Sequence, residues 1–213
     1  MEAARRRAGR VNGRRPLIIL FGLAVTALLT ACSSTDTGSP TAASTTTDPP
    51  SAPTSTSAQT APRVASPLNV GQFTATPCSA LTVADLPALK LTGSSAQAKI
   101  AYGAPVCEWN PQDAEHTLAI SWISPKNTGL SALYSQRSDM EYWQTLSVDG
   151  YPAVFADFAD LRTHGDCRIN VGVNDAVFFI ADYQTIMDSD KPQACNLAQT
   201  AAADVIKNLQ GGR

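Results

Sequence analysis

Hydrophobic and polar residues alternate along much of the second half of the chain, and this alternation predicts strands. Leu118, Ile120 and Trp122, for example, occupy every second position and should share one face of a strand. The same reasoning predicts strands at 94–101, 106–109, 117–123, 143–148, 151–158, 167–173 and 176–183. The last of these segments is apolar on both faces, which is typical of a central strand.

Helical spacing and turn residues complete the pattern. They predict helices at 82–89, 129–142 and 194–209. The buried stripe of the last helix should consist of Ala198, Ala202, Val205 and Leu209. Asp149-Gly150 stands between two apolar runs and predicts a tight hairpin. Helices mixed with several antiparallel strands indicate an α+β fold, in which helices pack on one antiparallel sheet.

A different pattern occupies the N-terminal end of the chain. Residues 17–29 are nearly all apolar and follow an arginine-rich stretch, which is typical of a secretory signal. The run is shorter than the roughly 20 apolar residues that span a bilayer. Leu29-Thr30-Ala31-Cys32 fits the lipobox of a bacterial lipoprotein. We therefore expect residues 1–31 to be a signal peptide and Cys32 to be lipidated; an uncleaved membrane anchor is the alternative.

Residues 32–70 have the composition of a spacer. From 33 to about 67 the chain consists mainly of Ser, Thr, Pro and Ala, without aromatic residues, Leu, Ile or Met. Such a segment cannot bury enough apolar surface to offset the entropy lost on ordering. We expect lipidated Cys32 to be followed by a disordered stalk over 32–70. Residues 71–213 would then form a single globular domain of the usual size.

The net charge of −2 hides an acidic domain. Six of the sixteen basic residues and one acidic residue lie within 1–31, so the remainder has 10 basic and 17 acidic residues and a net charge of −7. A domain of this charge repels phosphate backbones. Nucleic acid is therefore excluded as a partner, and contact with the membrane should come from the acyl chains on Cys32.

Four further cysteines, Cys78, Cys107, Cys167 and Cys195, lie within the predicted domain. None forms a Cys-x-x-Cys pair, which argues against zinc and thioredoxin-like sites. An even number of cysteines in an exported domain predicts two disulfides, for which three connectivities exist. We favour Cys78–Cys107 and Cys167–Cys195, because each would join the start of a terminal helix to the start of a strand.

Short motifs recur in a fixed order along the predicted domain. They are Pro77-Cys78-Ser79-Ala80-Leu81, Cys107-Glu108-Trp109, the segments 148–154 and 167–171, and Cys195 at the start of the last helix. With these motifs and the lipobox, the chain resembles the actinobacterial lipoproteins grouped as domain of unknown function 3558. The resemblance spans about residues 77–209 and implies a secreted, lipid-anchored, disulfide-bonded domain. It carries no established activity, so it implies no catalytic residues.

Candidate chemistry is sparse. His164 with Asp160 or Asp166 could form a metal site or an acid–base pair, although a polar loop is the favoured interpretation. His116 follows Glu115 and is expected to face solvent. The chain has no His-Glu-x-x-His, Gly-x-Ser-x-Gly or Ser-x-x-Lys motif and no phosphate-binding glycine loop. We predict no catalytic residue, no metal and no cofactor.

Aromatic side chains are expected mainly in the core. They are Trp109, Trp122, Tyr142, Trp143, Tyr151, Phe155 and Phe158. An alternative is that Tyr142-Trp143 and Tyr151-Pro152, which flank one hairpin, line a groove for an apolar or sugar ligand.

These patterns favour a non-enzymatic binding or scaffolding lipoprotein, anchored on the extracytoplasmic face of the cell membrane. It would bind another envelope protein or a cell-wall component. The alternative is a carrier of a lipid or another apolar ligand, which requires a cavity of several hundred Å³. An enzyme such as a hydrolase is the least favoured. A cleft that gathers His164 with Asp160 or Asp166 would support it.

Overall fold

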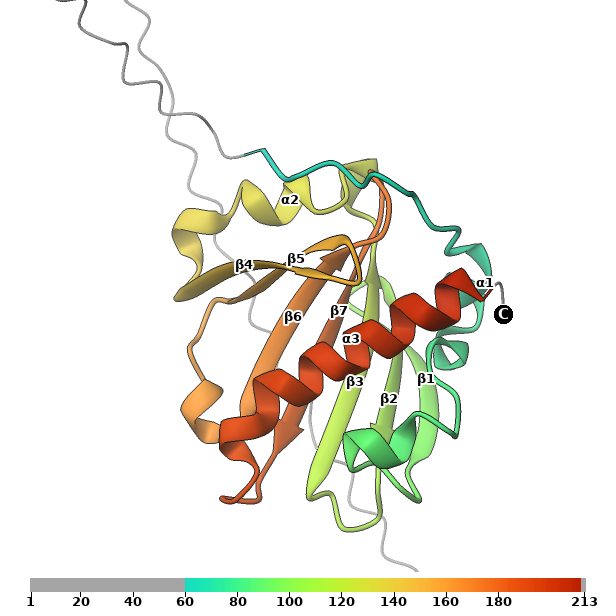
Figure 1. Cartoon of the computed structure of the whole chain (residues 1–213), viewed down its shortest axis with the longest axis vertical. Coiled ribbons are helices and arrows are strands. Elements are labelled where there is room, and N and C mark those ends of the chain that lie inside the picture. Colours follow the sequence, from blue (N-terminus) through green and yellow to red (C-terminus); the bar gives the residue numbers. More distant parts are fainter. Residues whose placement is uncertain (1–59, 212–213) are drawn as a thin grey trace, which may run out of the picture. The chain divides into compact units, whose positions relative to one another are not determined.

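The computed structural model describes residues 60–211, in which seven strands form one antiparallel sheet (Figure 1). The strands are β1 (Ser95–Ala101), β2 (Ala104–Asn110), β3 (His116–Ile123), β4 (Tyr142–Val148), β5 (Tyr151–Asp157), β6 (Asp166–Gly172) and β7 (Phe178–Thr185). Their order across the sheet is β1-β2-β3-β7-β6-β5-β4. The sheet confirms the α+β prediction, and β7 is the central strand that its apolar sequence predicts.

Of the three predicted helices, only the last is found over its full predicted length. The α-helices are α1 (Gly71–Ala75), α2 (Ser131–Tyr134) and α3 (Ala194–Gln210). Short 3-10 helices lie at η1 (Pro77–Ala80), η2 (Leu86–Leu89), η3 (Pro125–Asn127), η4 (Arg137–Asp139), η5 (Arg162–His164) and η6 (Lys191–Gln193). Only α3 is a long helix, and it crosses one face of the sheet diagonally (Figure 1).

Two predicted helices are therefore wrong in extent. The segment 82–89 forms a turn followed by η2, and 129–142 divides into α2 and η4. In the second segment the side chains of Ser135 and Gln136 both donate hydrogen bonds to the carbonyl oxygen of Ala132. Such bonds compete with the regular helical ladder, which explains why α2 ends at Tyr134.

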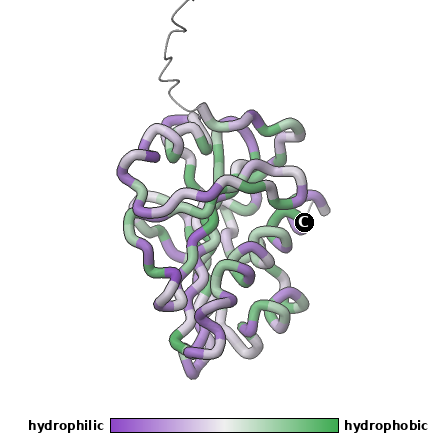
Figure 2. Tube along the Cα trace, turned by 60° about the vertical axis from the view of Figure 1, so that its left-hand side comes forward, coloured by the Kyte–Doolittle hydropathy of each residue, from purple (hydrophilic) through white to green (hydrophobic). Residues whose placement is uncertain are grey.

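The main core lies between the sheet and α3. The predicted stripe of Ala198, Ala202, Val205 and Leu209 is buried, and its small residues let the helix lie close to the strands. On the same side of the sheet, Phe179 of β7 packs beside Trp122 of the adjacent β3, with ring centroids 5.5 Å apart. Figure 2 shows hydrophobic stretches along the central strands and along α3. We call this side of the sheet the covered face.

Both disulfides have the favoured connectivity. Cys78–Cys107 joins η1 to β2, and Cys167–Cys195 joins the start of β6 to the start of α3. Each closes a loop of 28 or 29 residues. On the chain-entropy model a loop of this length stabilises the fold by about 3–4 kcal/mol. The bridges thus fasten both ends of the domain to the sheet.

The opposite side of the sheet is covered only in part. A smaller cluster joins α2 and the segment before it to β4, β5 and one end of β7; its buried members are Ala61, Leu130, Leu133, Tyr134, Val154, Ala156 and Phe178. Beyond this cluster, most side chains that point away from α3 are half-buried or exposed, while Val106 and Asn170 are buried. We call this part the open face; it is formed by Lys99, Glu108, Thr117, Ala119, Ser121, Asp166, Arg168, Ile180, Asp182 and Gln184.

Residues 60–70 correct the predicted boundary between stalk and domain. The backbone N–H of Leu68 donates to the carbonyl oxygen of Val173 (2.9 Å), and the side chain of Asn174 donates to the carbonyl oxygen of Leu68 (3.0 Å). Val64 and Val70 are buried. The domain therefore begins before Val64 rather than at residue 71. The predicted signal peptide, Cys32 and the stalk up to residue 59 lie outside the described residues.

Two hairpins have the same tight turn. Asp149 and Gly150 have φ values of 48° and 85°, which confirms the predicted hairpin between β4 and β5. Tyr102 and Gly103 join β1 to β2 with φ values of 52° and 80°. Positive φ at both positions is the signature of a type I′ turn. The second strand therefore begins at Ala104, two residues before the start predicted for it.

Candidate functional site on the open face

The open face contains a hollow of about 360 Å³ between the β1–β2 hairpin and β6. Its floor is mostly apolar and includes Val106, Ala119, Ile123 and Ile180. One side carries the ion pair between Lys99 and Glu108, and the other carries the ion pair between Arg168 and Asp182. We call this the first hollow.

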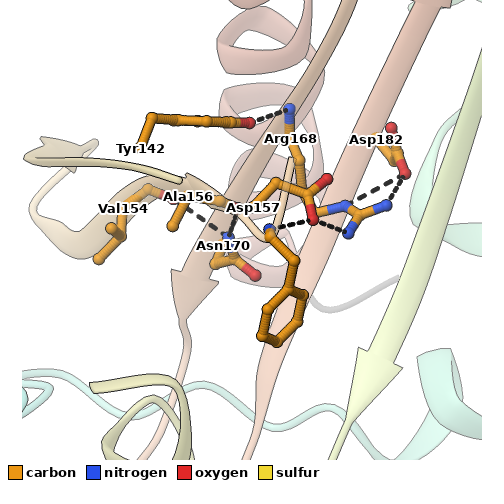
Figure 3. A network of polar contacts seen from close by, with 8 residues as sticks. Tyr142, Val154, Ala156, Asp157, Arg168, Asn170 and Asp182 are labelled. Carbon is orange, nitrogen blue, oxygen red and sulfur yellow. Dashed lines mark hydrogen bonds and ion pairs between the residues drawn. The ribbon is translucent and has the colours of Figure 1, made fainter. Parts of the chain in front are cut away.

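Arg168 is the centre of a polar network at one side of the first hollow (Figure 3). Its Nη1 donates to Oδ1 of Asp157 (2.8 Å), and its Nη2 donates to Oδ2 of Asp182 (2.6 Å). Its backbone N–H also donates to the hydroxyl of Tyr142 (3.4 Å). Burial opposes the charge on the guanidinium, but the carboxylates outweigh it and raise the pKa of Arg168. The network thus holds a permanent charge on the sheet surface.

The network exists because β5 separates from β6. Their pairing covers only three residue pairs, the last of them Phe155 with Ile169. Asn170 pairs with Val154 within this short ladder, and its Nδ2 donates to the carbonyl oxygens of Val154 (3.3 Å) and, just beyond the ladder, Ala156 (3.2 Å) (Figure 3). Asn170 is only 1% exposed, so these bonds satisfy backbone groups that the separated strands would leave unpaired.

Asp166 lies next to this network and is half-buried. Burial, followed by the charge of Asp182, raises the pKa of Asp166 to about 7. Oδ1 of Asp182 is buried without a donor from any described residue. The interaction with Asp182 adds to the effect of burial, and it keeps the carboxyl group of Asp166 mostly protonated below about pH 7.

A second hollow of about 290 Å³ adjoins Asp166 at the end of the open face. Its lining includes Thr117, His164, Asp166 and Gln184. The structure thus brings two of the three proposed acid–base residues to one hollow. The third, Asp160, accepts two hydrogen bonds from Arg162 instead, at 2.7 and 2.6 Å.

Gly165 determines how closely this loop approaches the sheet. Its φ is 90°, and a Cβ at this position would lie 2.3 Å from the carbonyl oxygen of Thr185. Only glycine fits such a close approach. The glycine thereby fixes the loop that carries His164 on one side and Asp166 on the other.

Tyr102 is the most unusual residue of the site. It is fully exposed at the tip of the β1–β2 hairpin, and it lines both the first hollow and a third hollow of about 440 Å³ near Trp122 and Pro125. Its φ of 52° is one that Asn and Gly adopt far more readily than an aromatic residue. The hairpin therefore holds a large ring in solvent at a conformational cost.

His116 does not face solvent, contrary to the prediction. It is 7% exposed; its Nδ1 lies 3.1 Å from the hydroxyl of Tyr183, and its Nε2 lies 3.3 Å from Oδ2 of Asp190. The Tyr183 hydroxyl donates its only proton to the carbonyl oxygen of Leu89 (2.9 Å), so Nδ1 of His116 must be the donor. His116 thus ties β3 and β7 to the loops before α3 and after η2.

The aromatic residues are distributed mostly as expected. Trp109, Trp122, Tyr142, Tyr151 and Phe155 are buried, Trp143 is half-buried, and Phe158 is 58% exposed, contrary to prediction. The proposed groove at the β4–β5 hairpin is not formed, because Tyr142 and Tyr151 belong to the main core. Among residues 60–211, no group of three or more His, Cys, Asp or Glu side chains is placed to hold a metal ion.

Together these features define a small, disulfide-bonded α+β domain built on a single antiparallel sheet with one covered and one open face. The chain belongs to the family described as "Protein of unknown function (DUF3558)", whose match extends over residues 27–208. No curated protein and no solved structure matches the chain. Among residues 60–211, none of the helices is long and apolar enough to cross a membrane.

Proposed function

We propose that this protein is a lipid-anchored lipoprotein on the extracytoplasmic face of the cell membrane, and that its domain binds another envelope protein without catalysis. The open face is the binding surface. The anchor is Cys32, whose lipobox follows a secretory-type signal in the sequence. In this arrangement the segment between Cys32 and the domain sets how far the binding surface reaches from the bilayer.

The observation that carries the proposal is the state of Tyr102. An aromatic side chain in solvent gains nothing for folding, and at a positive φ it costs stability. Exposed tyrosines that stand beside hollows are typical anchors of protein interfaces, because the ring buries much area at a small entropic cost. Tyr102 thus supplies the first hollow with a large exposed ring at its rim.

The shape of the first hollow favours a polypeptide partner over an enclosed small molecule. Small-molecule sites usually surround most of the ligand surface, whereas this hollow is open to solvent along the sheet. Its apolar floor between two ion pairs matches the mixed chemistry of protein interfaces. A lipid carrier would have to leave much of its ligand in water, which gives that alternative less support.

Site-specific crosslinking in native envelopes tests the proposal. A photoreactive residue in place of Tyr102 should form one dominant protein adduct, while the same residue in place of Val83, which is 84% exposed in a loop, should not. The variant Ser121→Arg, which fills the floor of the first hollow, should abolish the adduct. Equal adducts from both positions, or an adduct that survives Ser121→Arg, would contradict a binding role for this face.

The anchor is tested separately. Cys32→Ala should release the protein from the membrane fraction and prevent incorporation of a labelled fatty acid. If this variant remains membrane-bound after high-salt washing, lipidation is not the attachment.

A second candidate function is hydrolysis at the second hollow, favoured by the shared position of His164 and Asp166. A carboxyl group with a pKa near 7 suits general acid–base work near neutral pH. The test is an assay with a panel of ester, phosphoester and glycoside substrates. Hydrolysis by the wild type that is lost in both His164→Ala and Asp166→Asn would support this function. Activity that persists in either variant would exclude this site.

A further inference from the structure

The outer edge of β1 is unpaired within the part of the chain that the structure describes. β1 pairs only with β2, and residues 95–100 are all exposed. Natural sheets usually protect such an edge with charges, proline, a bulge or a covering segment. The only charge on β1 is Lys99, which is already engaged with Glu108 on the adjacent strand. The edge is therefore open to another strand.

We propose that β1 pairs with β1 of a second copy of this chain, antiparallel and centred on Ala98. The two sheets then continue into one another across a two-fold axis.

The hairpin determines which backbone groups are available. The type I′ turn places Ala101 opposite Ala104, and in a two-residue hairpin this closing pair is hydrogen-bonded. Because bonded and non-bonded positions alternate, Ala96, Ala98 and Ile100 direct their N–H and C=O groups away from β2. These three residues offer a regular set of donors and acceptors at the edge.

The sequence of β1 is complementary to itself in this register. Ala98 faces its copy, and Ala96 faces Ile100, so each opposed pair exchanges both of its N–H···O bonds. All seven residues of the strand are used. Gln97 faces Lys99 of the second copy at a non-hydrogen-bonded position, where side chains lie closest. A shift of the axis to Lys99 would instead oppose two like charges, which is unfavourable.

The same pairing covers exposed apolar surface and orders the open faces. Ile100, 72% exposed in the single chain, packs beside Ala96 of the second copy. The two-fold axis of an antiparallel edge pair is normal to the sheet, so both first hollows lie on the same side. An edge pair buries a small interface, so we expect a dissociation constant in the micromolar range, on the order of 10 µM.

Sedimentation of the full chain in mild detergent, over a concentration series, tests the pairing. The wild type should shift from monomer to dimer. Ala98→Pro removes one outward N–H without removing a bond to β2, and an edge strand tolerates proline at such a position. This variant should remain monomeric over the same range, whereas the control Ala98→Ser, which keeps the N–H, should dimerise like the wild type.

A charge pair tests the register and does not depend on proline being tolerated. Gln97→Lys opposes Lys99 of the second copy twice per dimer and should weaken dimerisation by about threefold to tenfold. Gln97→Glu should strengthen it by a similar factor, and both differences should shrink in high salt. A wild type that stays monomeric, a dimer that persists in Ala98→Pro, or two Gln97 variants that shift in the same direction would each overturn the proposal.

Discussion

The two faces of this single-layer sheet differ in how their side chains are packed. On the covered face the side chains of β6 and β7 pack against α3, those of β3 pack against the N-terminal segment at η1 and Phe73, and most of them are buried and apolar. On the open face the alternating residues of the same strands form ion pairs and hollows. Burial on the covered face supplies most of the buried apolar surface of the fold, whereas hollows remain on the open face. Function should therefore be sought there.

The largest expected difference compares two neighbours on β7. Phe179 is completely buried on the covered face, while Ile180 is half-buried on the open face. Phe179→Ala should lower the free energy of unfolding by about 3–5 kcal/mol, because it leaves a cavity in the main core. Ile180→Ala should cost about 1–2 kcal/mol, since less buried surface is lost.

Urea unfolding followed by circular dichroism measures both changes. If the two substitutions cost the same, the open face contributes to the core as much as the covered face does. The contrast between the two faces would then have no energetic basis.

A smaller effect is expected from Arg168, which has a matched control in Arg162. Arg168→Ala leaves Asp157 and Asp182 without their cation at a partly buried position and should cost about 2–3 kcal/mol. Arg162→Ala breaks an exposed pair and should cost less than about 1 kcal/mol. Thermal unfolding of both variants gives the comparison. Equal losses would mean that the network in Figure 3 is an ordinary surface contact.

The strands of this fold are readable from the sequence because their signals are local. Alternation identified most of the strands, a continuous apolar run identified β7, and Asp149-Gly150 identified its hairpin. The predicted helix over 129–142 was wrong in extent, because side chains there compete with backbone N–H groups for the carbonyl oxygens. These side-chain hydrogen bonds end α2 at Tyr134. The predicted end of the stalk was wrong because three apolar residues, Val64, Leu68 and Val70, are too few to show a helical or strand period.

The open face was only partly predictable. His116 has the same parity as Leu118, Ile120 and Trp122, so the alternation that placed those residues inside also placed the histidine inside. The contact between Asp166 and Asp182 joins two strands, and no spacing within either strand reveals it. The turn at Tyr102 could have been predicted from the sequence, because a glycine follows Tyr102 between two predicted strands.

The raised pKa of Asp166 predicts how stability depends on pH. The folded pKa of about 7 lies above the usual 3.8, so the folded state binds more protons between these values. Its contribution is complete below about pH 4 and is lost as the pH rises through 7. Allowing for partial exposure, the loss is about 1–2 kcal/mol. Asp166→Asn, whose side chain does not titrate, should remove this slope.

Denaturant unfolding at pH 5 and pH 8 measures the difference directly. The wild type should lose stability over this interval relative to Asp166→Asn, and Asp160→Asn serves as the exposed control. A parallel decline in all three proteins would show that other groups produce the slope.

The smallest predicted effect is the most informative, because the substitution should raise the stability of the domain rather than lower it. Tyr102→Asn places Asn-Gly, the preferred type I′ pair, in the β1–β2 turn and should stabilise the domain by about 0.5–1 kcal/mol. The same substitution should abolish binding of the envelope partner, since the exposed ring is the proposed anchor. Thermal unfolding tests the first expectation, and crosslinking from a photoreactive residue in place of Ala104, which lines the same hollow, tests the second in proteins with Tyr102 or Asn at position 102. A variant that is more stable and still binds would show that the tyrosine is merely tolerated, whereas a gain in stability with a loss of binding would show that the open face keeps a residue that folding alone would reject.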